Sequence, residues 1–200
     1  MSTLVSSDEW GPELPTISST RVSLQPLSET DVPALFAIFS NPEVTQYWGS
    51  PRMTSVDEAA ELLRRIQESF RTRQLFQWGV RRTDDSTLLG TCTLLHMDRV
   101  HRRSEIGFAL GRNHWGRGYA TEAVAALIDW SFGELGLHRL EADVDPRNQR
   151  SLRLLERLGF QREGYLRERY HQDGETQDTA FLGLLSHEWI RPGPPVGMNR

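Results

Sequence analysis

The glycine-containing segment 115–120, which reads WGRGYA, constrains the fold more than any other part of the chain. It follows residues 104–111, whose alternating apolar side chains predict a strand, and it precedes residues 122–135, whose spacing predicts a helix. Two glycines at such a turn allow the backbone to approach a ligand closely. The beginning of a helix adds unpaired N–H groups and the positive end of the helix dipole. The segment therefore predicts an anion site suited to a pyrophosphate, to which Thr121 can add a hydroxyl and Arg117 a charge.

A Gly-x-Gly pair before a helix also occurs in plain turns and in dinucleotide-binding loops. The dinucleotide fingerprint G-x-G-x-x-G would require a third glycine where Thr121 stands. Its loop also opens a βαβ unit, whereas the strands predicted before Gly116 look like an antiparallel hairpin. A nicotinamide cofactor is therefore disfavoured, and a phosphate site and a plain turn are the two readings left open.

The basic residues are all arginine, since the 200-residue chain has 23 basic residues and no lysine among them. A Walker-A phosphate loop and a Schiff-base enzyme both need a lysine, so both are excluded. The net charge of −4 argues against direct nucleic acid binding, which favours a basic face. Because no apolar run approaches the roughly 20 residues of a membrane-spanning helix, no membrane association is expected.

Cys92 is the only cysteine, and it lies in the apolar run 88–95, which indicates a core position. No intrachain disulfide can form, which fits a reducing, cytoplasmic location. The six histidines show neither the His-Glu-x-x-His motif nor a paired Cys-His spacing, so no metal site is predicted.

One folded domain is expected over residues 19–190, where neither a linker nor an internal repeat interrupts the pattern. Residues 1–18 indicate a flexible N-terminal arm, and the proline- and glycine-rich residues 191–200 indicate a flexible tail. The domain is predicted to be α/β (mixed α+β), with a mostly antiparallel twisted sheet and about four helices. The predicted elements are strands over 21–26, 76–80, 87–97, 104–111, 137–144, 160–170 and 176–187, and helices over 28–41, 55–70, 122–135 and 149–158.

Three segments carry a resemblance to a known family. They are residues 115–123 (WGRGYATEA), 145–151 (DPRNQRS) and 155–160 (LERLGF). Together they resemble the GNAT superfamily of N-acetyltransferases, and in particular the RimJ/RimL type, which acetylates the N-termini of ribosomal proteins. The family's pyrophosphate loop reads Gln/Arg-x-x-Gly-x-Gly/Ala. Gly118 and Ala120 match its small residues, whereas Trp115 departs from its first position, as is common in the RimJ/RimL type.

The resemblance implies that acetyl-CoA is the cosubstrate, with no metal. It also implies a GNAT fold in which the strand at 104–111 splays away from the strand at 137–144, with acetyl-CoA between them. The backbone of the first strand would pair with pantetheine, and the loop amides would hold the pyrophosphate. The residues expected to bind the cosubstrate are Phe108, Ala109, Leu110, Trp115, Gly116, Arg117, Gly118, Tyr119, Ala120, Thr121, Asn148 and Arg153.

The catalytic groups are expected from the same resemblance. A glutamate at the position of Glu105 serves as general base in several GNAT enzymes. Many members use a tyrosine as general acid where this chain has Leu155, and leucine cannot donate a proton. In the RimJ/RimL type a serine matching Ser151 takes that place, and its hydroxyl could bond the thiolate. Tyr170 is a further candidate on the acceptor side.

The acceptor is expected to be a primary amine, most simply a protein or peptide N-terminus. An α-amine has a pKa near 8 and lysine a pKa near 10.4, so at neutral pH the lysine costs roughly 4–5 kcal/mol to deprotonate and the α-amine only about 1. Tyr47 and Trp48 are the residues expected to bind the acceptor. The alternatives are a small amine, such as a polyamine, aminoglycoside or amino compound, and a non-catalytic acyl-CoA-binding module, which Leu155 favours. Exposed apolar residues near the last strand could support a homodimer.

Overall fold

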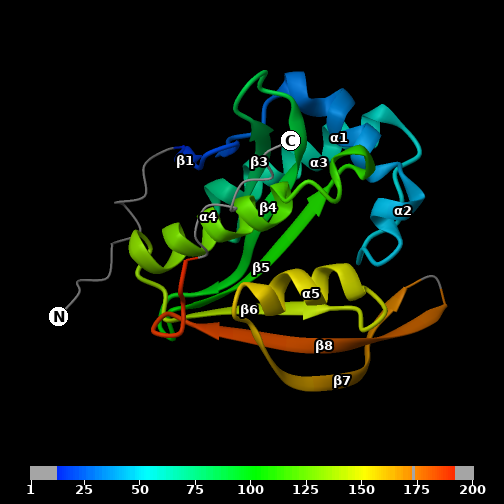
Figure 1. The fold of residues 1–200 in the computed structure, drawn as a ribbon. Coiled ribbons are helices and arrows are strands. Elements are labelled where there is room, and N and C mark those ends of the chain that lie inside the picture. Colours follow the sequence, from blue (N-terminus) through cyan, green and yellow to red (C-terminus); the bar gives the residue numbers. More distant parts are fainter. Residues whose placement is uncertain (1–12, 173, 192–200) are drawn as a thin grey trace, which may run out of the picture.

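A computed structural model describes residues 13–172 and 174–191, which form one eight-stranded sheet with helices on both faces (Figure 1). The sheet order is β1-β2-β3-β4-β5-β6-β8-β7. The strands are β1 (Ile17–Ser18), β2 (Val22–Gln25), β3 (Leu75–Arg82), β4 (Leu88–Asp98), β5 (Arg103–Leu110), β6 (Arg139–Val144), β7 (Gln161–Gln172) and β8 (Glu175–Leu185). The helices are α1 (Val32–Phe39), α2 (Pro42–Thr45), α3 (Val56–Arg71), α4 (Tyr119–Gly133) and α5 (Gln149–Arg157), with single 3-10 turns at Glu29–Asp31 and Arg112–His114. The predicted α/β class is confirmed.

The sheet is antiparallel throughout except between β5 and β6, which run parallel. Their pairing covers only residues 103–105 of β5 and 139–141 of β6. Beyond that point β5 continues in register with β4, whereas β6 continues in register with β8. Figure 1 shows β5 rising away from β6, with α5 lying beside β6. The predicted splay between these two strands is therefore confirmed.

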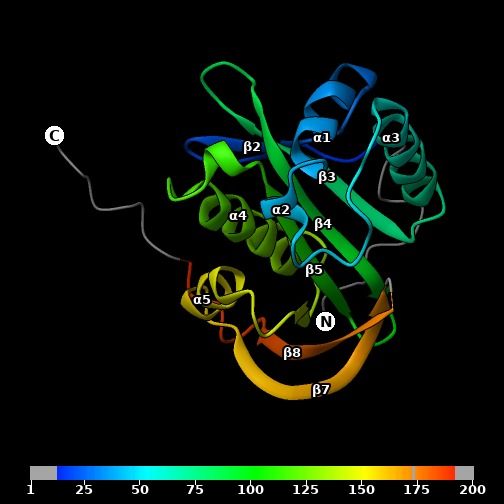
Figure 2. The ribbon, with the colours of Figure 1, turned by 90° about the vertical axis from the view of Figure 1, so that its right-hand side faces the viewer.

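Two hydrophobic clusters hold the helices to opposite faces of the sheet (Figure 2). Alternate residues of β5 show the division, because successive side chains of a strand point to opposite faces. Ile106 packs into the larger cluster with α4 and α5, and Ala109 packs into the smaller cluster with α1 and α3. Glu105, four residues before Ala109, therefore lies on the α1/α3 face of the sheet.

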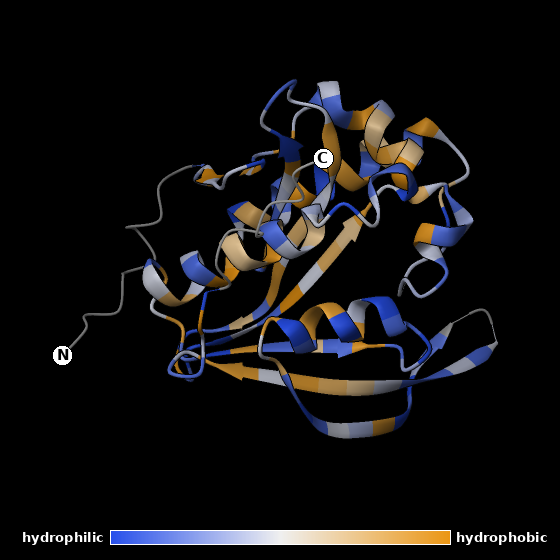
Figure 3. Ribbon diagram, viewed as in Figure 1, coloured by the Kyte–Doolittle hydropathy of each residue, from blue (hydrophilic) through white to orange (hydrophobic). Residues whose placement is uncertain are grey.

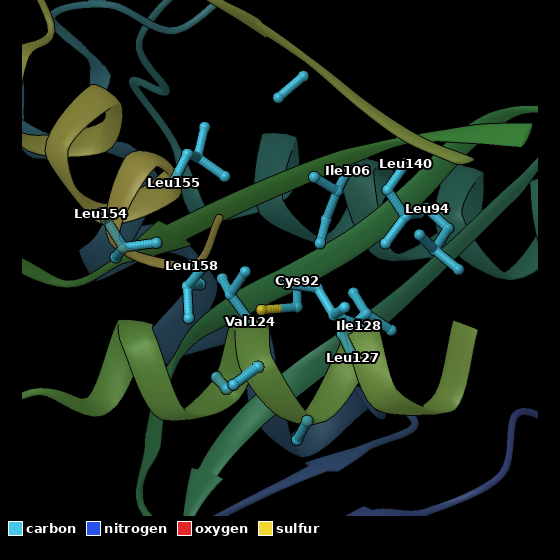
Figure 4. Close-up of a cluster of buried hydrophobic side chains, with 14 of the residues drawn as sticks. Cys92, Leu94, Ile106, Val124, Leu127, Ile128, Leu140, Leu154, Leu155 and Leu158 are labelled. Carbon is cyan, nitrogen blue, oxygen red and sulfur yellow. The ribbon is translucent and has the colours of Figure 1, made fainter. Parts of the chain in front are cut away.

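The larger cluster surrounds Cys92, which is fully buried beside Val124, Leu127 and Ile128 of α4 (Figure 4). Burial raises the pKa of the Cys92 thiol to about 12, so the side chain behaves as a small apolar group. The predicted core position of Cys92 is confirmed. Leu155 of α5 is fully buried in the same cluster, where full burial of a leucine is worth roughly 1.5–3 kcal/mol.

Capping side chains set where the helices begin. The Ser55 hydroxyl accepts from the N–H of Glu58 at 3.3 Å, and it starts α3 where the sequence predicted. Before α1, the carboxylate of Asp31 accepts from the N–H of Ser28 at 2.8 Å. Polar and apolar residues alternate along α5 with helical spacing, and its leucines pack into the core (Figure 3).

Some boundaries differ from the predicted ones. The predicted arm is wrong at its end, because Ile17–Ser18 forms β1 and pairs with β2, while residues 1–12 lie outside the described part. The first helix ends before Pro42 as predicted, but Asn41 then caps a further short helix, α2, which raises the α-helices of the described residues to five. Helix α4 begins at Tyr119, three residues earlier than predicted.

The C-terminal boundary is described only as far as Arg191, which forms an ion pair with Asp129 at 3.1 Å. The rest of the predicted tail, residues 192–200, and Asp173, which lies between β7 and β8, are outside the described residues. Over the residues that the structure describes, no helix is long and apolar enough to cross a membrane.

Candidate functional site

The edge of β5 that faces β6 is unpaired with β6 beyond Glu105. Backbone groups of successive residues alternate between the two edges of a strand. The N–H of Gly111 donates to the Leu89 carbonyl on β4 at 2.8 Å, so Phe108 and Leu110 direct their N–H and C=O groups toward the unpaired edge. Ala109 faces the opposite way, where it pairs with Thr91 of β4. Of residues 108–110, which are predicted to pair with pantetheine, Phe108 and Leu110 therefore have their backbone groups on the unpaired edge.

Trp115 lies at the end of this edge. Its Nε1–H donates to the Leu110 carbonyl at 2.7 Å, which fixes the indole beside β5. The guanidinium carbons of Arg112 and Arg150 lie 5.0 and 4.8 Å from the centre of the ring. Arg112 also donates to Glu43 of α2 at 2.7 Å. Trp115 thus connects the end of β5 with α5 and, through Arg112, with α2.

The loop before α4 has the backbone that the two glycines predicted. Gly116 has a φ of 76° and Gly118 a φ of 79°, in the left-handed region that favours glycine. Gly118 is the N-cap of α4, and no side chain among the described residues caps the helix there. The N–H groups of the first turn, from Tyr119 to Thr121, have no intrahelical acceptor and are oriented to bind an anion.

Arg21, which immediately precedes β2, supports this loop from behind. It donates to the Arg117 carbonyl at 3.0 Å and to the Glu122 carboxylate at 2.8 Å, and its guanidinium lies over the Tyr119 ring. Burial opposes ionisation of Glu122, but the hydrogen bonds from Arg21 outweigh burial and lower its pKa. The Glu122 charge, which would repel an anion at the start of α4, is therefore matched by a cation. Sequence reasoning missed Arg21, because its partners lie about a hundred residues away.

The beginning of α5 holds two of the predicted residues. The Asn148 side-chain oxygen accepts from the N–H of Ser151 at 3.1 Å, so Asn148 is the N-cap and its amide NH2 group is not used by the cap. Both residues are half-buried, and Arg153 is exposed on the same helix. Leu155 is fully buried in the core, so no proton donor stands at its position.

Glu105 lies at the point where β5 leaves β6, opposite Glu141. Its side chain is 18% exposed, and one carboxylate oxygen lies 2.9 Å from Nδ1 of His96. Burial raises the pKa of Glu105, the hydrogen bond to His96 opposes that rise, and the charge of Asp143 adds to it. A half-buried carboxylate with a raised pKa suits a general base.

Tyr170 is brought to the same face from β7. A backbone irregularity between Leu166 and Tyr170, with a positive φ at Glu168, turns the Tyr170 side chain toward β6. Its hydroxyl donates to the Asp143 carboxylate at 2.8 Å. Burial and this hydrogen bond raise the pKa of Tyr170 to about 12, so the phenol stays protonated near neutral pH.

The two residues predicted to bind the acceptor follow α2. Trp48 packs against Phe39 of α1, with ring centres 5.4 Å apart, and it borders the smaller cluster. Tyr47 lies against the guanidinium of Arg147, which is 5.7 Å from its ring centre and is held by Asp145 before α5. The segment after α2 therefore contacts the α5 side of the splay through Tyr47.

The structure thus places the predicted residues in two groups. The glycine loop before α4, the unpaired edge of β5 and the cap of α5 surround the splay. Glu105 and Tyr170 lie on the α1/α3 face, where the Tyr170 hydroxyl donates to Asp143 and the charge of Asp143 acts on Glu105. Asp143 and His96 were missed, although their polar side chains in alternating strand sequences were a signal. Over the described residues, no group of three or more His, Cys, Asp or Glu side chains could hold a metal ion.

Comparison with known proteins bears on this geometry. The family described as "Acetyltransferase (GNAT) domain" matches residues 21–161. The chain is 36% identical over 171 residues to "Uncharacterized N-acetyltransferase YoaA" of Bacillus subtilis (strain 168), which is 86% of this chain and 97% of that protein. It is 34% identical over 105 residues to "Putative ribosomal N-acetyltransferase YdaF" of the same strain, which is 52% of this chain and 57% of that protein.

Among solved structures, spermidine N-acetyltransferase from Vibrio cholerae in complex with CoA and spermine aligns with a TM-score of 0.74 and 25% identity. The alignment covers 84% of this chain and 97% of that chain. The splayed strands and the glycine loop at α4 are the parts of the architecture that position the predicted site. The chain belongs to the GNAT family and is an N-acetyltransferase that uses acetyl-CoA.

Proposed function

We propose that this enzyme acetylates the N-terminal α-amine of a protein or peptide, with Glu105 as the general base. The observation that carries the proposal is the position of Glu105. It is a half-buried carboxylate with a raised pKa at the point where β5 and β6 diverge, on the face that carries α1 and α3. A base there lies opposite the α4/α5 side, on which the pyrophosphate would bind.

The residues on the donor side fit acetyl-CoA. The left-handed Gly116 and Gly118 expose the N–H groups of the first turn of α4, which suit a pyrophosphate. The unpaired edge of β5 offers Phe108 N–H to pantetheine or to the thioester carbonyl, where it would stabilise the developing oxyanion. The side-chain amide of Asn148 would donate a hydrogen bond to pantetheine, and the exposed Arg153 would bind the 3′-phosphate.

Proton transfer follows from the same placement. Glu105 accepts a proton from the acceptor ammonium, directly or through water, and the neutral amine attacks the thioester carbonyl. Ser151 at the start of α5 offers its hydroxyl to the departing thiolate. The α-amine is preferred over lysine, because its deprotonation at neutral pH costs about 1 kcal/mol against roughly 4–5 for lysine.

A peptide acceptor is also favoured by the surface of β7. The Leu166 and Tyr170 side chains are 39% and 41% exposed on the hairpin beside Glu105, and they offer apolar contact to a chain. Tyr47 and Trp48 border the acceptor side from α2. YdaF, which is named as a putative ribosomal N-acetyltransferase, matches 52% of this chain. This likeness supports an acceptor of the RimJ/RimL type.

A polyamine is the second candidate. The carboxylates Glu105 and Asp143 on one face would attract a polycation, and the aligned Vibrio cholerae protein is a spermidine N-acetyltransferase. A polyamine amine is as basic as lysine, so this reading requires stronger acidification of the ammonium than an α-amine does.

The experiment is CoA thiol release from acetyl-CoA with a panel of acceptors. The panel holds peptides with free N-terminal Ser, Ala or Thr, the same peptides N-acetylated, an N-blocked lysine peptide and spermidine. Release with the free N-terminal peptides alone supports the proposal. Release with spermidine and not with the peptides replaces it with the second candidate.

A further inference from the structure

Asp143 of β6 is a buried carboxylate that the reaction described above does not use. It lies two residues beyond Glu141, the last residue of β6 that pairs with β5. Its side chain is 4% exposed. The Oδ2 atom accepts from the Tyr170 hydroxyl at 2.8 Å, whereas Oδ1 is buried and has no hydrogen-bond partner among the described residues.

A buried carboxylate oxygen without a hydrogen bond is costly, and in native proteins such an atom usually serves a ligand or water. Among the described residues, Arg169 forms an ion pair with Asp143, with Nε 3.6 Å from Oδ2. That distance is too long for a hydrogen bond, and the Arg169 side chain is 51% exposed, so the pair is weak. A small cation with N–H donors could displace Arg169 at little cost.

Of the carboxylates that neighbour Asp143, Glu141 is already paired with arginine side chains. Glu141 accepts from Arg103 at 2.9 Å and from Arg139 at 2.8 Å, on the same face of the sheet. Among the described residues, the ion-pair partner of Glu105 is His96, which is 73% exposed and lies 2.9 Å away. Two carboxylates of this face, at Glu105 and Asp143, therefore lack a firmly bound cation.

Strand alternation places these two groups on one side. Glu105 is in register with Glu141, and Asp143 follows Glu141 by two residues, so all three point to the α1/α3 face. Burial is the main cause of the raised pKa of Glu105, and the negative charge of Asp143 on the same face adds to the rise. An ammonium group lying between them would satisfy Oδ1 and reduce their repulsion.

We propose that Asp143 is the residue that selects and binds the protonated amino group of the acceptor, next to the base Glu105. This inference rests on the proposed function, in which Glu105 receives the proton of that ammonium. Tyr170 orients the Asp143 carboxylate through its hydroxyl, and the acceptor ammonium replaces the Arg169 side chain. Asp143 thus acts on acceptor binding and leaves the donor site alone.

The test compares Asp143→Asn with wild type and with Glu68→Gln, which removes one carboxylate charge on the exposed side of α3. Each protein is assayed with acetyl-CoA and either spermidine or a peptide with a free N-terminal serine. We expect Asp143→Asn to raise the acceptor KM by roughly tenfold to a hundredfold, as for loss of a hydrogen bond to a charged group. The KM for acetyl-CoA should stay within twofold, and Glu68→Gln should match wild type.

Calorimetry separates this proposal from the proposed function. Binding of spermidine and of the peptide to the CoA-loaded enzyme is measured beside their N-acetylated forms, which carry no charge at that nitrogen. Wild type should prefer the free amine, and Asp143→Asn should lose that preference whether or not thiol is released. Absence of amine binding to wild type, or an unchanged preference in Asp143→Asn, overturns the role of Asp143.

The Tyr170→Phe variant is a control for a general effect on folding. It removes the donor to Oδ2 and leaves the Asp143 charge, so the preference for the free amine should persist with a smaller rise in KM. If Tyr170→Phe abolished the preference as fully as Asp143→Asn, the charge of Asp143 would not be the selecting feature.

Discussion

Arg21 and Glu122 are joined by two hydrogen bonds, one from the Arg21 backbone N–H at 2.6 Å and one from its Nε at 2.8 Å. The pair ties β2 to the first turn of α4, directly behind the loop that we propose for the pyrophosphate. Glu122 lies at the helix N-terminus, where its negative charge interacts favourably with the helix dipole. Because Arg21 pairs with it, no unmatched negative charge lies beside the proposed anion site.

Replacing Arg21 by methionine should therefore weaken acetyl-CoA binding by about tenfold, because the loop loses a hydrogen bond to Arg117 and Glu122 loses its cation. Calorimetric titration with CoA measures the effect. Arg21→Met with Glu122→Gln should recover part of the affinity, since the uncompensated charge is then gone. A double variant weaker than the single one would contradict this account.

Gly118 should tolerate substitution less well than Gly116. Both have left-handed φ angles, so alanine at either position costs roughly 1–2 kcal/mol. A Cβ at Gly118 would also lie 3.2 Å from the Arg21 guanidinium, whereas a Cβ at Gly116 meets nothing within 4 Å. Thermal unfolding and CoA titration of the two alanine variants should show the larger losses for Gly118→Ala.

Glu105→Gln should reduce kcat/KM by roughly 10²- to 10⁴-fold, the range for loss of a general base, with CoA binding unchanged. It should also stabilise the fold at neutral pH. Burial raises the folded-state pKa of Glu105 above its value of 4.5 in the unfolded chain, so the wild-type carboxylate costs stability as pH rises through that window. The gain in Tm should vanish below pH 4.5, and equal Tm values at pH 7 would contradict the burial argument.

Removing His96 should shift the pH profile of the enzyme. The hydrogen bond from His96 lowers the pKa of Glu105 against the effect of burial. In His96→Ala the Glu105 pKa rises further, so the acidic limb of log kcat/KM moves to higher pH. His101→Ala, on the turn between β4 and β5, is the matched control and should leave that limb in place.

Ser151→Ala should lower kcat by about tenfold or more with little change in Tm, if the hydroxyl assists the thiolate. The cap of α5 uses the Asn148 side chain and the Ser151 backbone N–H, both of which the variant keeps. Asn148→Ala should instead cost roughly 0.5–2 kcal/mol of stability. A parallel loss of Tm in Ser151→Ala would assign the serine to the helix alone.

Local patterns predicted the loop and the helices well. The turn at Gly116 and Gly118, the helix start at Ser55 and the core position of Cys92 each depend on neighbours within a few residues, or on apolar character alone. The splay of β5 from β6 came from the family resemblance, because no local pattern specifies where two strands stop pairing.

Long-range contacts account for what was missed. In the sequence Arg21 looks like an ordinary strand residue, because its contact with Glu122 of α4 depends on the tertiary fold. Strand β1 has two residues, too few to show an alternating pattern. Asp143 points away from the larger cluster in the predicted strand, and its contact with Tyr170 joins strands that are far apart in the sequence. The sequence does not say which edge of a strand the backbone groups of a residue face, so it could not distinguish Ala109, in register with Thr91 of β4, from Phe108 and Leu110.

The hydrogen bond from the Trp115 indole to the Leu110 carbonyl should also favour solubility, because it covers part of an unpaired strand edge. A strand edge with free N–H and C=O groups can pair with the edge of another chain and begin aggregation. In this enzyme the indole covers the last carbonyl of β5, and Arg112 and Arg150 add two positive charges around it. The unpaired edge that we propose to bind the donor is therefore protected at its end against pairing with another chain.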